Sequence, residues 1–195
     1  MYTLIGGTKT RTFRVRWLLE ELEQPYTHHP AGPRSDPVTT HYPAGKIPVL
    51  LDGDTALTDS TAILTYLSDK HGAFTHTPGS IERGIQDGHT QFILDEMDSL
   101  LWTAARHGFI LPEDKRVAGV KDSLKWEYET SLSRLEQRLG AGPFLMGETM
   151  TIADIIAVHC LGWAIVAKFP QPSGTVSSYF DTLRHRPAYQ RARSD

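Results

Sequence analysis

The fold is decided by residues 2–29, YTLIGGTKTRTFRVRWLLEELEQPYTHH. A short apolar run precedes two glycines, and this order predicts a strand followed by a loop. The apolar residues that follow share one helical face at the i, i+3, i+4 and i+7 spacing: Val15, Leu18, Leu19 and Leu22. Pro25 ends that pattern, and Tyr26 to His29 predict a second strand. The segment therefore predicts a βαβ unit.

The remainder of the first 72 residues predicts two further strands and a helix. Ile47 to Leu51 and Ala56-Leu57 flank Asp52-Gly53, a dipeptide that supplies the positive φ angles of a two-residue hairpin. These two strands should be antiparallel. Asp59-Ser60 then caps a helix that ends at His71-Gly72. The first domain is predicted to be βαβ, loop, ββα over residues 1–72.

The rest of the chain predicts helices. Residues 73–80 lack periodicity and contain Pro78-Gly79, so they are expected to be a linker. Two apolar stripes predict two long packed helices, one through Ile85, Phe92, Ile93, Met97, Leu100, Leu101 and Ala104 and the other through Leu124, Tyr128, Leu132, Leu135 and Leu139. A last amphipathic piece around residues 179–183 leads to Arg186-Pro187 and a polar tail. The fold class is α+β, with an all-helical domain over residues 81–195.

Composition narrows the class of protein. The chain has 195 residues, 39% of them hydrophobic, and 20 Lys+Arg against 23 Asp+Glu give a net charge of −3. These values predict an ordered globular protein without the basic excess of a general nucleic-acid binder. Cys160, the single cysteine, excludes an internal disulfide. The N-terminus has no signal-peptide pattern and no apolar run reaches about 20 residues, so we expect a cytoplasmic protein without a membrane span.

Several conspicuous residues have structural explanations. Thr151 and Asp154 form a capping box, which accounts for both as helix-start residues. Cys160 lies within an apolar helical run and is expected in the core. His28 and His29 are expected at the surface of a strand edge, because no further His or Cys stands nearby at zinc-like spacing. No metal site is predicted.

The first helix begins among polar residues that allow two interpretations. Lys9, Arg11 and Arg14 place positive charge near the positive end of the helix dipole, a conflict that an anionic ligand would relieve. Alternatively, these side chains are solvated and screening makes the conflict negligible. In the same way, Thr10 or Thr12 either contributes a functional hydroxyl or merely caps the helix.

Four stretches, in this order, resemble the cytosolic glutathione S-transferases, and in particular their bacterial-type members. They are Phe13-Arg-Val-Arg-Trp-Leu-Leu-Glu-Glu-Leu22, Gly45-Lys-Ile-Pro-Val-Leu50, Asp59-Ser-Thr-Ala-Ile63 and Thr151-Ile-Ala-Asp154. The resemblance spans nearly the whole chain. It implies a thioredoxin-like N-terminal domain that binds glutathione, followed by an all-α helical bundle.

In this family a Tyr, Ser or Cys before the first helix faces the glutathione sulfur. Alignment on Arg14-Val15 places Thr10 at the Ser or Cys position, whereas the tyrosine position falls near Ile5, which has no hydroxyl. A hydroxyl that donates to sulfur, together with helix-start amides, favours the thiolate. Arg11 would stabilise the same thiolate by its charge. The resemblance therefore implies Thr10 and Arg11 as catalytic residues and leaves the activating group open between them and a backbone amide.

The resemblance also implies a glutathione site and a second, electrophile site. Lys46, Ile47 and Pro48 match the family's cis-proline turn, where the backbone before the proline pairs with the peptide of glutathione. Asp59 and Ser60 would hold the γ-glutamyl ammonium and carboxylate, although simple helix capping explains them too. The expected electrophile pocket contains Trp102, Arg106 and Phe109, and Trp102 could equally belong to the core.

The function implied is conjugation of the glutathione thiolate to a hydrophobic electrophile. The alternatives are a glutathione-dependent peroxidase, disulfide reductase or isomerase, and a non-catalytic glutathione-binding module. A homodimer is also implied, in which the first domain of one subunit meets the first long helix of the other. Acidic residues flank the apolar stripe of that helix and would face the partner: Asp87, Asp95, Glu96 and Asp98. In some relatives an acid from the partner's helix reaches the γ-glutamyl ammonium. By this resemblance Asp95 or Asp98 would do so here; alternatively, both are simply solvated.

Overall fold

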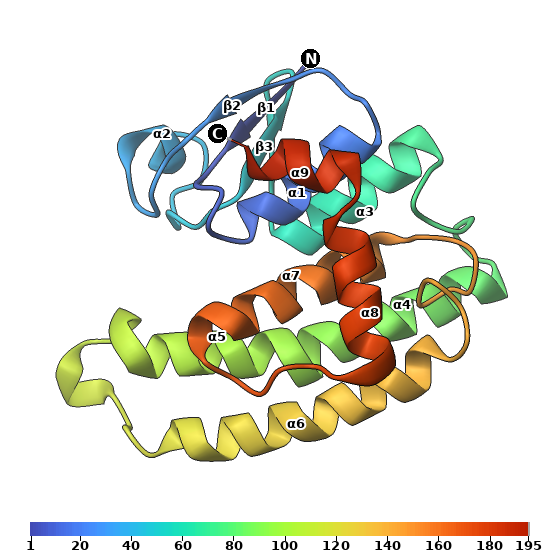
Figure 1. Ribbon diagram of the computed structural model, residues 1–195. Coiled ribbons are helices and arrows are strands. Elements are labelled where there is room, and N and C mark those ends of the chain that lie inside the picture. The colour runs from blue at the N-terminus through green and yellow to red at the C-terminus, as the bar shows by residue number, and fades with distance from the viewer. Residues whose placement is uncertain (195) are drawn as a thin grey trace. The chain divides into compact units, whose positions relative to one another are not determined.

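The computed structural model describes residues 1–194, which form two compact units. The first unit contains residues 1–78 together with residues 183–194, and the second contains residues 79–182. The first unit is built on a sheet and the second is helical (Figure 1). The α+β fold class predicted from the sequence is confirmed.

Four short strands form the sheet of the first unit: β1 (Tyr2–Ile5), β2 (Tyr26–His29), β3 (Val49–Asp52) and β4 (Thr55–Thr58). Their order is β2-β1-β3-β4. β1 runs parallel to β2 and antiparallel to β3, and β3 and β4 form an antiparallel hairpin. Gly53 in the hairpin turn has a φ of +59°, as the Asp-Gly dipeptide predicts.

Helices α1 (Thr12–Glu21), α2 (Asp36–Thr39) and α3 (Ser60–His71) belong to the same unit. α1 packs against β1 and against α3 (Figure 1). Their shared core contains fully buried side chains from the strands and both helices: Leu4, Val15, Trp17, Leu18, Leu19, Leu50, Ile63, Leu64 and Leu67. The apolar spacing that predicts α1 therefore marks the face that the helix buries.

The polar tail expected after Arg186-Pro187 is wrong, because these residues form helix α9 (Pro187–Arg193). Proline is well suited to the first helical position, since its missing N–H has no partner there. α9 packs against α1, and the ring of Tyr189 meets Phe13 and Trp17 edge-on at centroid distances of 5.0 and 4.9 Å. This segment lies in the first unit, whereas the sequence interpretation placed it with the helical domain.

An ion pair of good geometry joins α9 to α1. Both guanidinium nitrogens Nε and Nη2 of Arg186 donate to the carboxylate of Glu21, at 2.6 and 2.7 Å. The Glu21 side chain is 6% exposed, so this pair is partly shielded from water. The Glu21 carboxylate also raises the pKa of Arg186. A bidentate pair of this kind fixes the orientation of the two helices.

The second unit contains α4 (Ile81–Ile93), the π-helical turn η1 (Leu94–Asp98), α5 (Ser99–Ala105), the π-helical turn η2 (Arg106–Ile110), the 3-10 turn η3 (Glu113–Lys115), α6 (Val120–Leu139), α7 (Ile152–Ala167) and most of α8 (Gly174–Arg184). α4 to η2 follow one another without interruption, as the first apolar stripe predicts. α7 packs against α4 and α5. Ile85 departs from the stripe, since it is 51% exposed.

Asp154 anchors the start of α7 from within the core. Its Oδ2 accepts the backbone N–H of Thr151 at 2.8 Å, and its Oδ1 accepts the N–H of Leu145 and the hydroxyl of Tyr179, both at 2.9 Å. Thr151 completes the predicted capping box. Burial raises the pKa of Asp154, and the hydrogen bonds oppose that shift. The structural interpretation of Thr151 and Asp154 is confirmed.

Asp98 departs from its expected place on an exposed acidic edge. It is only 6% exposed, and the thiol of Cys160 lies 3.8 Å from its Oδ2. Cys160 itself is fully buried, as predicted. Other acids of the expected edge have basic neighbours, because Asp87 pairs with Arg83 and Glu96 with Arg134. Asp98 is the last residue of the π-helical turn at 94–98, and Met97 beside it is buried as well.

No helix within residues 1–194 combines the length and the apolar character that a membrane span requires.

Candidate functional site

Three segments of the first unit meet beside the C-terminal end of β1. Ile5 pairs with Val49, and Val49 pairs with Thr58. The residue after Ile5, the residue before Val49 and the residue after Thr58 therefore lie at the same end of these three strands. Gly6 has a φ of +143°, and a Cβ built on it would lie 2.2 Å from Thr12 Oγ1 and 3.2 Å from Ile47 Cβ. Only glycine fits this position. The loop before α1, the Ile47-Pro48 turn and the start of α3 are thereby brought together.

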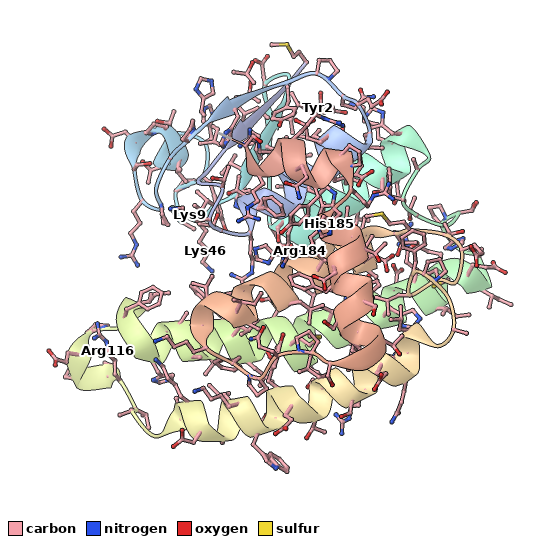
Figure 2. All side chains as sticks on the ribbon, viewed as in Figure 1. Tyr2, Lys9, Lys46, Arg116, Arg184 and His185 are labelled. Atoms are coloured by element: carbon pink, nitrogen blue, oxygen red, sulfur yellow. The ribbon has the colours of Figure 1, made fainter. Side chains whose placement is uncertain are left out.

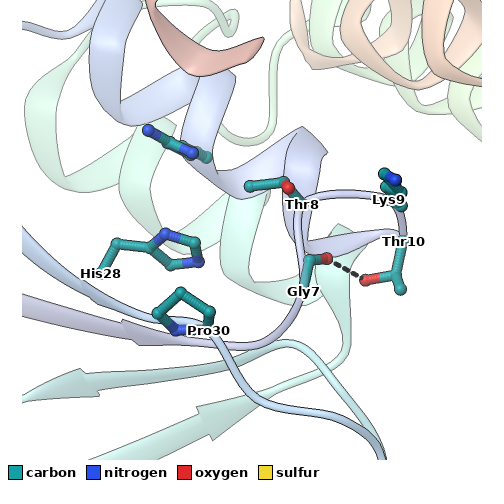
Figure 3. Close-up of a pocket in the computed structure, with 7 residues that line it drawn as sticks. Gly7, Thr8, Lys9, Thr10, His28 and Pro30 are labelled. Atoms are coloured by element: carbon teal, nitrogen blue, oxygen red, sulfur yellow. Dashed lines mark hydrogen bonds between the residues drawn. The ribbon is translucent and has the colours of Figure 1, made fainter. Parts of the chain in front are cut away.

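The hydroxyl of Thr10 already makes a hydrogen bond within its own loop. Its Oγ1 lies 2.7 Å from the carbonyl oxygen of Gly7, which can only accept, so the hydroxyl donates there (Figure 3). The same oxygen accepts the backbone N–H of Thr12 at 3.2 Å, at the first residue of α1. Arg11, at the N-cap position, makes no side-chain capping bond. Thr10 therefore satisfies a helix-start amide, which is the structural alternative that its sequence position left open.

Arg14 connects the first turn of α1 to the start of α3. Its side chain is fully buried, and its Nη1 donates to the hydroxyl oxygen of Ser60 across 3.5 Å. Ser60 is 3% exposed and is the first residue of α3. The buried guanidinium and the helix-start N–H groups both contribute positive charge to this corner. The sequence indicates that Arg14 lies near the start of a helix. Its burial could not be predicted from the sequence, because the contact with Ser60 joins residues 46 positions apart.

Asp59 occupies an uncommon backbone conformation at the N-cap of α3. Its φ is +69°, a region that non-glycine residues seldom adopt, and its side chain is exposed. Oδ1 accepts the backbone N–H groups of Thr61 and Ala62 at 2.9 and 3.1 Å. The capping function predicted for Asp59 is confirmed. Its second carboxylate oxygen accepts no hydrogen bond from residues 1–194.

The Ile47-Pro48 peptide bond is cis, as the resemblance implies. Pro48 is buried and Ile47 is half-buried against a small cluster around Val49. Lys46 precedes them and is exposed; Figure 2 shows Lys9 and Lys46 on the first unit. The residues predicted for the glutathione site therefore all lie in one unit, around one edge of its sheet.

An open cavity of about 370 Å³ lies beside the loop before α1 (Figure 3). It is lined by Gly7, Thr8, Lys9, Thr10, Arg16, His28 and Pro30. Thr8, Arg16, His28 and Pro30 were missed by the sequence analysis. His28 pairs with Leu4 and His29 pairs with Ile5, in the parallel pairing of β1 and β2. A prediction of this pairing from the βαβ pattern would have placed His28 beside the loop that follows β1.

His28 is half-buried, whereas its sequence position predicted an exposed strand edge. Its Nε2 lies 2.8 Å from the carbonyl oxygen of Gly6, and because a carbonyl only accepts, Nε2 carries the proton. His29 is exposed, as expected. Among the described residues, no group of three or more His, Cys, Asp or Glu side chains is arranged to hold a metal ion.

The three residues predicted for the electrophile pocket lie in the second unit, on α5 and η2. Trp102 is 36% exposed and Phe109 is 72% exposed, which are high values for large apolar side chains. Arg106 lies between them in sequence and donates from Nη2 to Thr103 Oγ1 at 3.1 Å. Trp102 is thus at the surface of the unit rather than in its core.

The sequence matches two family models, the Glutathione S-transferase, N-terminal domain over residues 12–77 and the Glutathione S-transferase, C-terminal domain over residues 127–191. A curated relative, the glutathione S-transferase theta-2 of Rattus norvegicus, is 34% identical over 58% of this chain and 49% of its own length. The probable elongation factor 1-gamma 2 of Arabidopsis thaliana is 30% identical over 78% of this chain and 38% of its own length. The chain thus spans less than two thirds of either relative.

The fold has close counterparts among solved structures. The theta class glutathione S-transferase of Xanthomonas axonopodis pv. citri, solved with glutathione bound, superposes with a TM-score of 0.80 at 22% identity and covers 100% of this chain and 97% of that one. This likeness supports the fold expected from the resemblance. Because models of both domains match in their proper order and theta-class relatives align with the sequence, the chain belongs to the cytosolic glutathione S-transferase family.

Proposed function

We propose that the protein is a glutathione transferase that conjugates the glutathione thiolate to a hydrophobic electrophile. The observation that carries the proposal is the start of α3. There Asp59 is held at a φ of +69°, and its Oδ1 accepts both helix-start amides while its other carboxylate oxygen accepts no hydrogen bond from residues 1–194. A strained residue of this kind persists when the surrounding structure enforces it, and such residues gather at ligand sites.

The start of α3 suits the charged end of glutathione. The exposed Asp59 carboxylate would receive the γ-glutamyl ammonium. The γ-glutamyl carboxylate would bind at the N–H groups of the first turn and Ser60, where the buried Arg14 adds positive charge. The peptide backbone of glutathione would pair with that of Ile47, as an added strand does. Exposed Lys46 would lie near the glycine carboxylate.

Activation of the thiol is assigned principally to Arg11. Thr10 would have to give up its 2.7 Å hydrogen bond to the Gly7 carbonyl oxygen before its hydroxyl could donate to sulfur. A guanidinium beside the sulfur favours the thiolate by its charge, and the amides at the start of α1 act in the same direction. Thr10 would then hold the loop in place, and a rotated Thr10 hydroxyl remains the alternative activator.

In the proposed reaction, the thiol proton leaves to solvent and the thiolate sulfur attacks the electrophilic carbon. A carbon–sulfur bond forms, and a leaving group departs with its electron pair or the pair moves onto an activated double bond. Trp102, Arg106 and Phe109 would contact the electrophile. Because the sulfur is already ionised when glutathione is bound, the nucleophile is available at neutral pH.

The proposal is tested by titrating the thiolate absorbance of bound glutathione against pH. Arg11→Gln is expected to raise the pKa of the bound thiol, and Thr10→Val is expected to raise it less. Turnover of 1-chloro-2,4-dinitrobenzene measures conjugation in the same samples. Glutathione binding without an ionised thiol and without turnover would overturn the proposal, and a larger shift for Thr10→Val would transfer activation to the hydroxyl.

One observation favours a second candidate, a glutathione-binding module without turnover. The residue at the family's sulfur-facing position is a threonine whose proton already has an acceptor in the loop. Such a module would bind glutathione at Asp59 and Ser60 with full affinity and would leave the thiol pKa unchanged. The same titration therefore separates the two candidates.

We also propose that the protein is a homodimer in which Asp95 reaches the partner's glutathione site. Asp95 is exposed on η1, whereas the buried Asp98 is withdrawn from this role. Sedimentation at micromolar concentration should give about twice the 21.8 kDa chain mass. A monomer that retains full glutathione affinity would refute both the assembly and the shared site.

A further inference from the structure

The hydrogen-bonding groups of Arg106 are incompletely used. Among residues 1–194, its single hydrogen bond runs from Nη2 to Thr103 Oγ1. The Nε–H of the same guanidinium is buried and has no acceptor within the described part of the chain. Buried donors without partners are rare in proteins, because each costs the free energy of losing its water. The guanidinium is therefore a donor group for which the folded chain supplies too few acceptors.

No carboxylate compensates the charge of Arg106 along its own helix. The residues three and four positions away on either side are Trp102, Thr103, Phe109 and Ile110. Trp102 and Thr103 lie in the α-helical turn before Arg106, where this spacing makes them its neighbours on the helix surface. Phe109 and Ile110 belong to the π-helical turn that Arg106 begins. Arg106 is thus flanked along its helix by one hydroxyl and three large apolar side chains, and Trp102, Phe109 and Ile110 are 36%, 72% and 42% exposed.

A second arginine, Arg116, binds carbonyl groups at the C-terminal end of this helix. Arg116 donates from Nε to the carbonyl oxygen of Leu111 at 2.8 Å and from Nη2 to that of Phe109 at 3.3 Å. Figure 2 labels Arg116 at this end of the second unit. Carbonyl groups at a helix C-terminus carry partial negative charge and would repel an anion. Arg116 offsets that charge, and Arg106 keeps its donors for another acceptor.

The backbone at Arg106 is also unusual. Residues 106–110 form the π-helical turn η2, and such turns are rare and occur frequently at functional sites. The wider turn begins at Arg106 itself, so the guanidinium and the exposed Phe109 belong to the irregular part of the helix. This observation is independent of the unsatisfied Nε–H.

We propose that Trp102, Arg106 and Phe109 select ligands that combine an aromatic body with an oxyanion, a carboxylate or a sulfonate. The aromatic body would lie against Trp102 and Phe109, and the oxyanion would accept hydrogen bonds from the Arg106 guanidinium. Applied to catalysis, this inference rests on the proposed function and names its substrate class. The preferred electrophile is an anionic aromatic compound rather than a neutral one.

The test compares two electrophiles that differ in charge, 4-chloro-3-nitrobenzoate and 4-chloro-3-nitrobenzamide. In each, the sulfur of glutathione bonds to the ring carbon that loses chloride, and the thiol proton goes to solvent. Each kcat/KM is divided by the rate constant for free glutathione, which removes the difference in intrinsic reactivity. The wild-type protein is expected to favour the benzoate about tenfold, as a charge-assisted hydrogen bond allows.

Three variants locate the effect, with their folding checked by circular dichroism. Arg106→Gln should bring the preference close to one by slowing the benzoate reaction alone. Arg106→Lys should leave a smaller preference, because lysine retains the charge but not the planar fork. Lys115→Gln removes an exposed charge from the same end of the unit and should leave the preference unchanged. A wild-type preference near one, or one that survives in Arg106→Gln, would overturn the inference.

Binding of unreactive ligands separates this inference from the proposed function. Calorimetry with 4-nitrobenzoate and 4-nitrobenzamide requires no conjugation, and the benzoate should bind about tenfold more tightly in a manner that depends on Arg106. If this holds while neither chloro compound reacts, the proposed function fails and the ligand class stands. If both chloro compounds react at equal normalised rates, the function stands and the ligand class fails. If neither nitro compound binds, the ligand class fails.

Discussion

Asp59 and Asp154 both lie at the start of a helix and accept hydrogen bonds from backbone N–H groups, but the two units use them differently. Asp154 is fully buried, and protein donors from three other residues converge on its two oxygens. Asp59 is exposed, and its two amide bonds both go to Oδ1. The same residue type at the same helical position therefore holds the core together in one unit and presents a carboxylate oxygen to solvent in the other.

The hydrogen bonds of a helix-start carboxylate indicate whether it serves stability or ligand binding. A helix-start carboxylate whose acceptors are filled by the protein contributes to stability and has nothing left for a ligand. A carboxylate that caps with one oxygen retains the other for an incoming ammonium. Asp154 should thus respond to substitution through the free energy of unfolding, and Asp59 through the affinity for glutathione.

The largest expected effect is the loss of stability in Asp154→Ala. The substitution leaves the N–H groups of Leu145 and Thr151 and the hydroxyl of Tyr179 without their acceptor inside the protein. We expect the free energy of unfolding, measured by urea denaturation, to fall by about 4 kcal/mol. Asp122→Ala removes an exposed acid from the first turn of α6 and should change it by less than about 1 kcal/mol. A loss below about 1 kcal/mol for Asp154→Ala would contradict the stabilising role that distinguishes Asp154 from Asp59.

The pH dependence of stability should reveal the burial of Asp154. Burial raises its pKa above the ordinary value of 3.8. A folded-state pKa above the unfolded one gives stability that is fully present below pH 3.8 and is lost as the pH rises through the folded-state value. Relative to Asp154→Asn, wild-type stability should therefore fall with rising pH, by at most about 1.4 kcal/mol per pH unit. Urea denaturation of both proteins between about pH 4 and about pH 7 measures this difference; a rise with pH would contradict it.

Asp59→Asn separates capping from ligand binding. Asparagine caps a helix as well as aspartate and tolerates positive φ, so the free energy of unfolding should stay within about 0.5 kcal/mol of the wild-type value. The charge that receives the γ-glutamyl ammonium is lost, and glutathione affinity measured by calorimetry should fall about tenfold. Asp54→Asn in the hairpin turn makes the same charge change and should leave the affinity unchanged. An unchanged glutathione affinity in Asp59→Asn would show that the charge of Asp59 does not contribute to binding and that the residue only caps α3.

The smallest of these effects is expected for Ser60→Ala. Its hydroxyl is a neutral partner of the γ-glutamyl carboxylate, so we expect glutathione affinity to fall about fivefold. The contact is remote from sulfur and similar in the ground and transition states, so kcat should be nearly unchanged. Steady-state kinetics with varied glutathione distinguishes the two parameters. A fall in kcat without a change in affinity would place Ser60 in the chemistry instead of in binding.

Much of the architecture was predictable because it depends on neighbours in the sequence. The spacing of Val15, Leu18 and Leu19 marks the buried face of α1, and Asp52-Gly53 marks the hairpin turn. The Asp59 cap and the Thr151 capping box join groups within three residues of each other. Periodicity and helix-start hydrogen bonds act over one or two turns of backbone, and a linear pattern records them.

The order of the four strands and of helices α1, α3, α4, α6 and α7, the two helix-start aspartates and the family were all predictable from the sequence. Which polar atoms stay available to a ligand depends on contacts between segments that are distant in sequence. Arg14 is buried and donates to Ser60 at the start of α3, and Asp98 is buried beside Cys160 of α7. α9 is a helix docked on α1 where a polar tail was expected. The Thr10 hydroxyl is committed to Gly7 by the path of its loop. The residue type sets which donors, acceptors and charges a side chain has. The segments that fold against the side chain, often distant in sequence, set which of these groups a ligand can still reach.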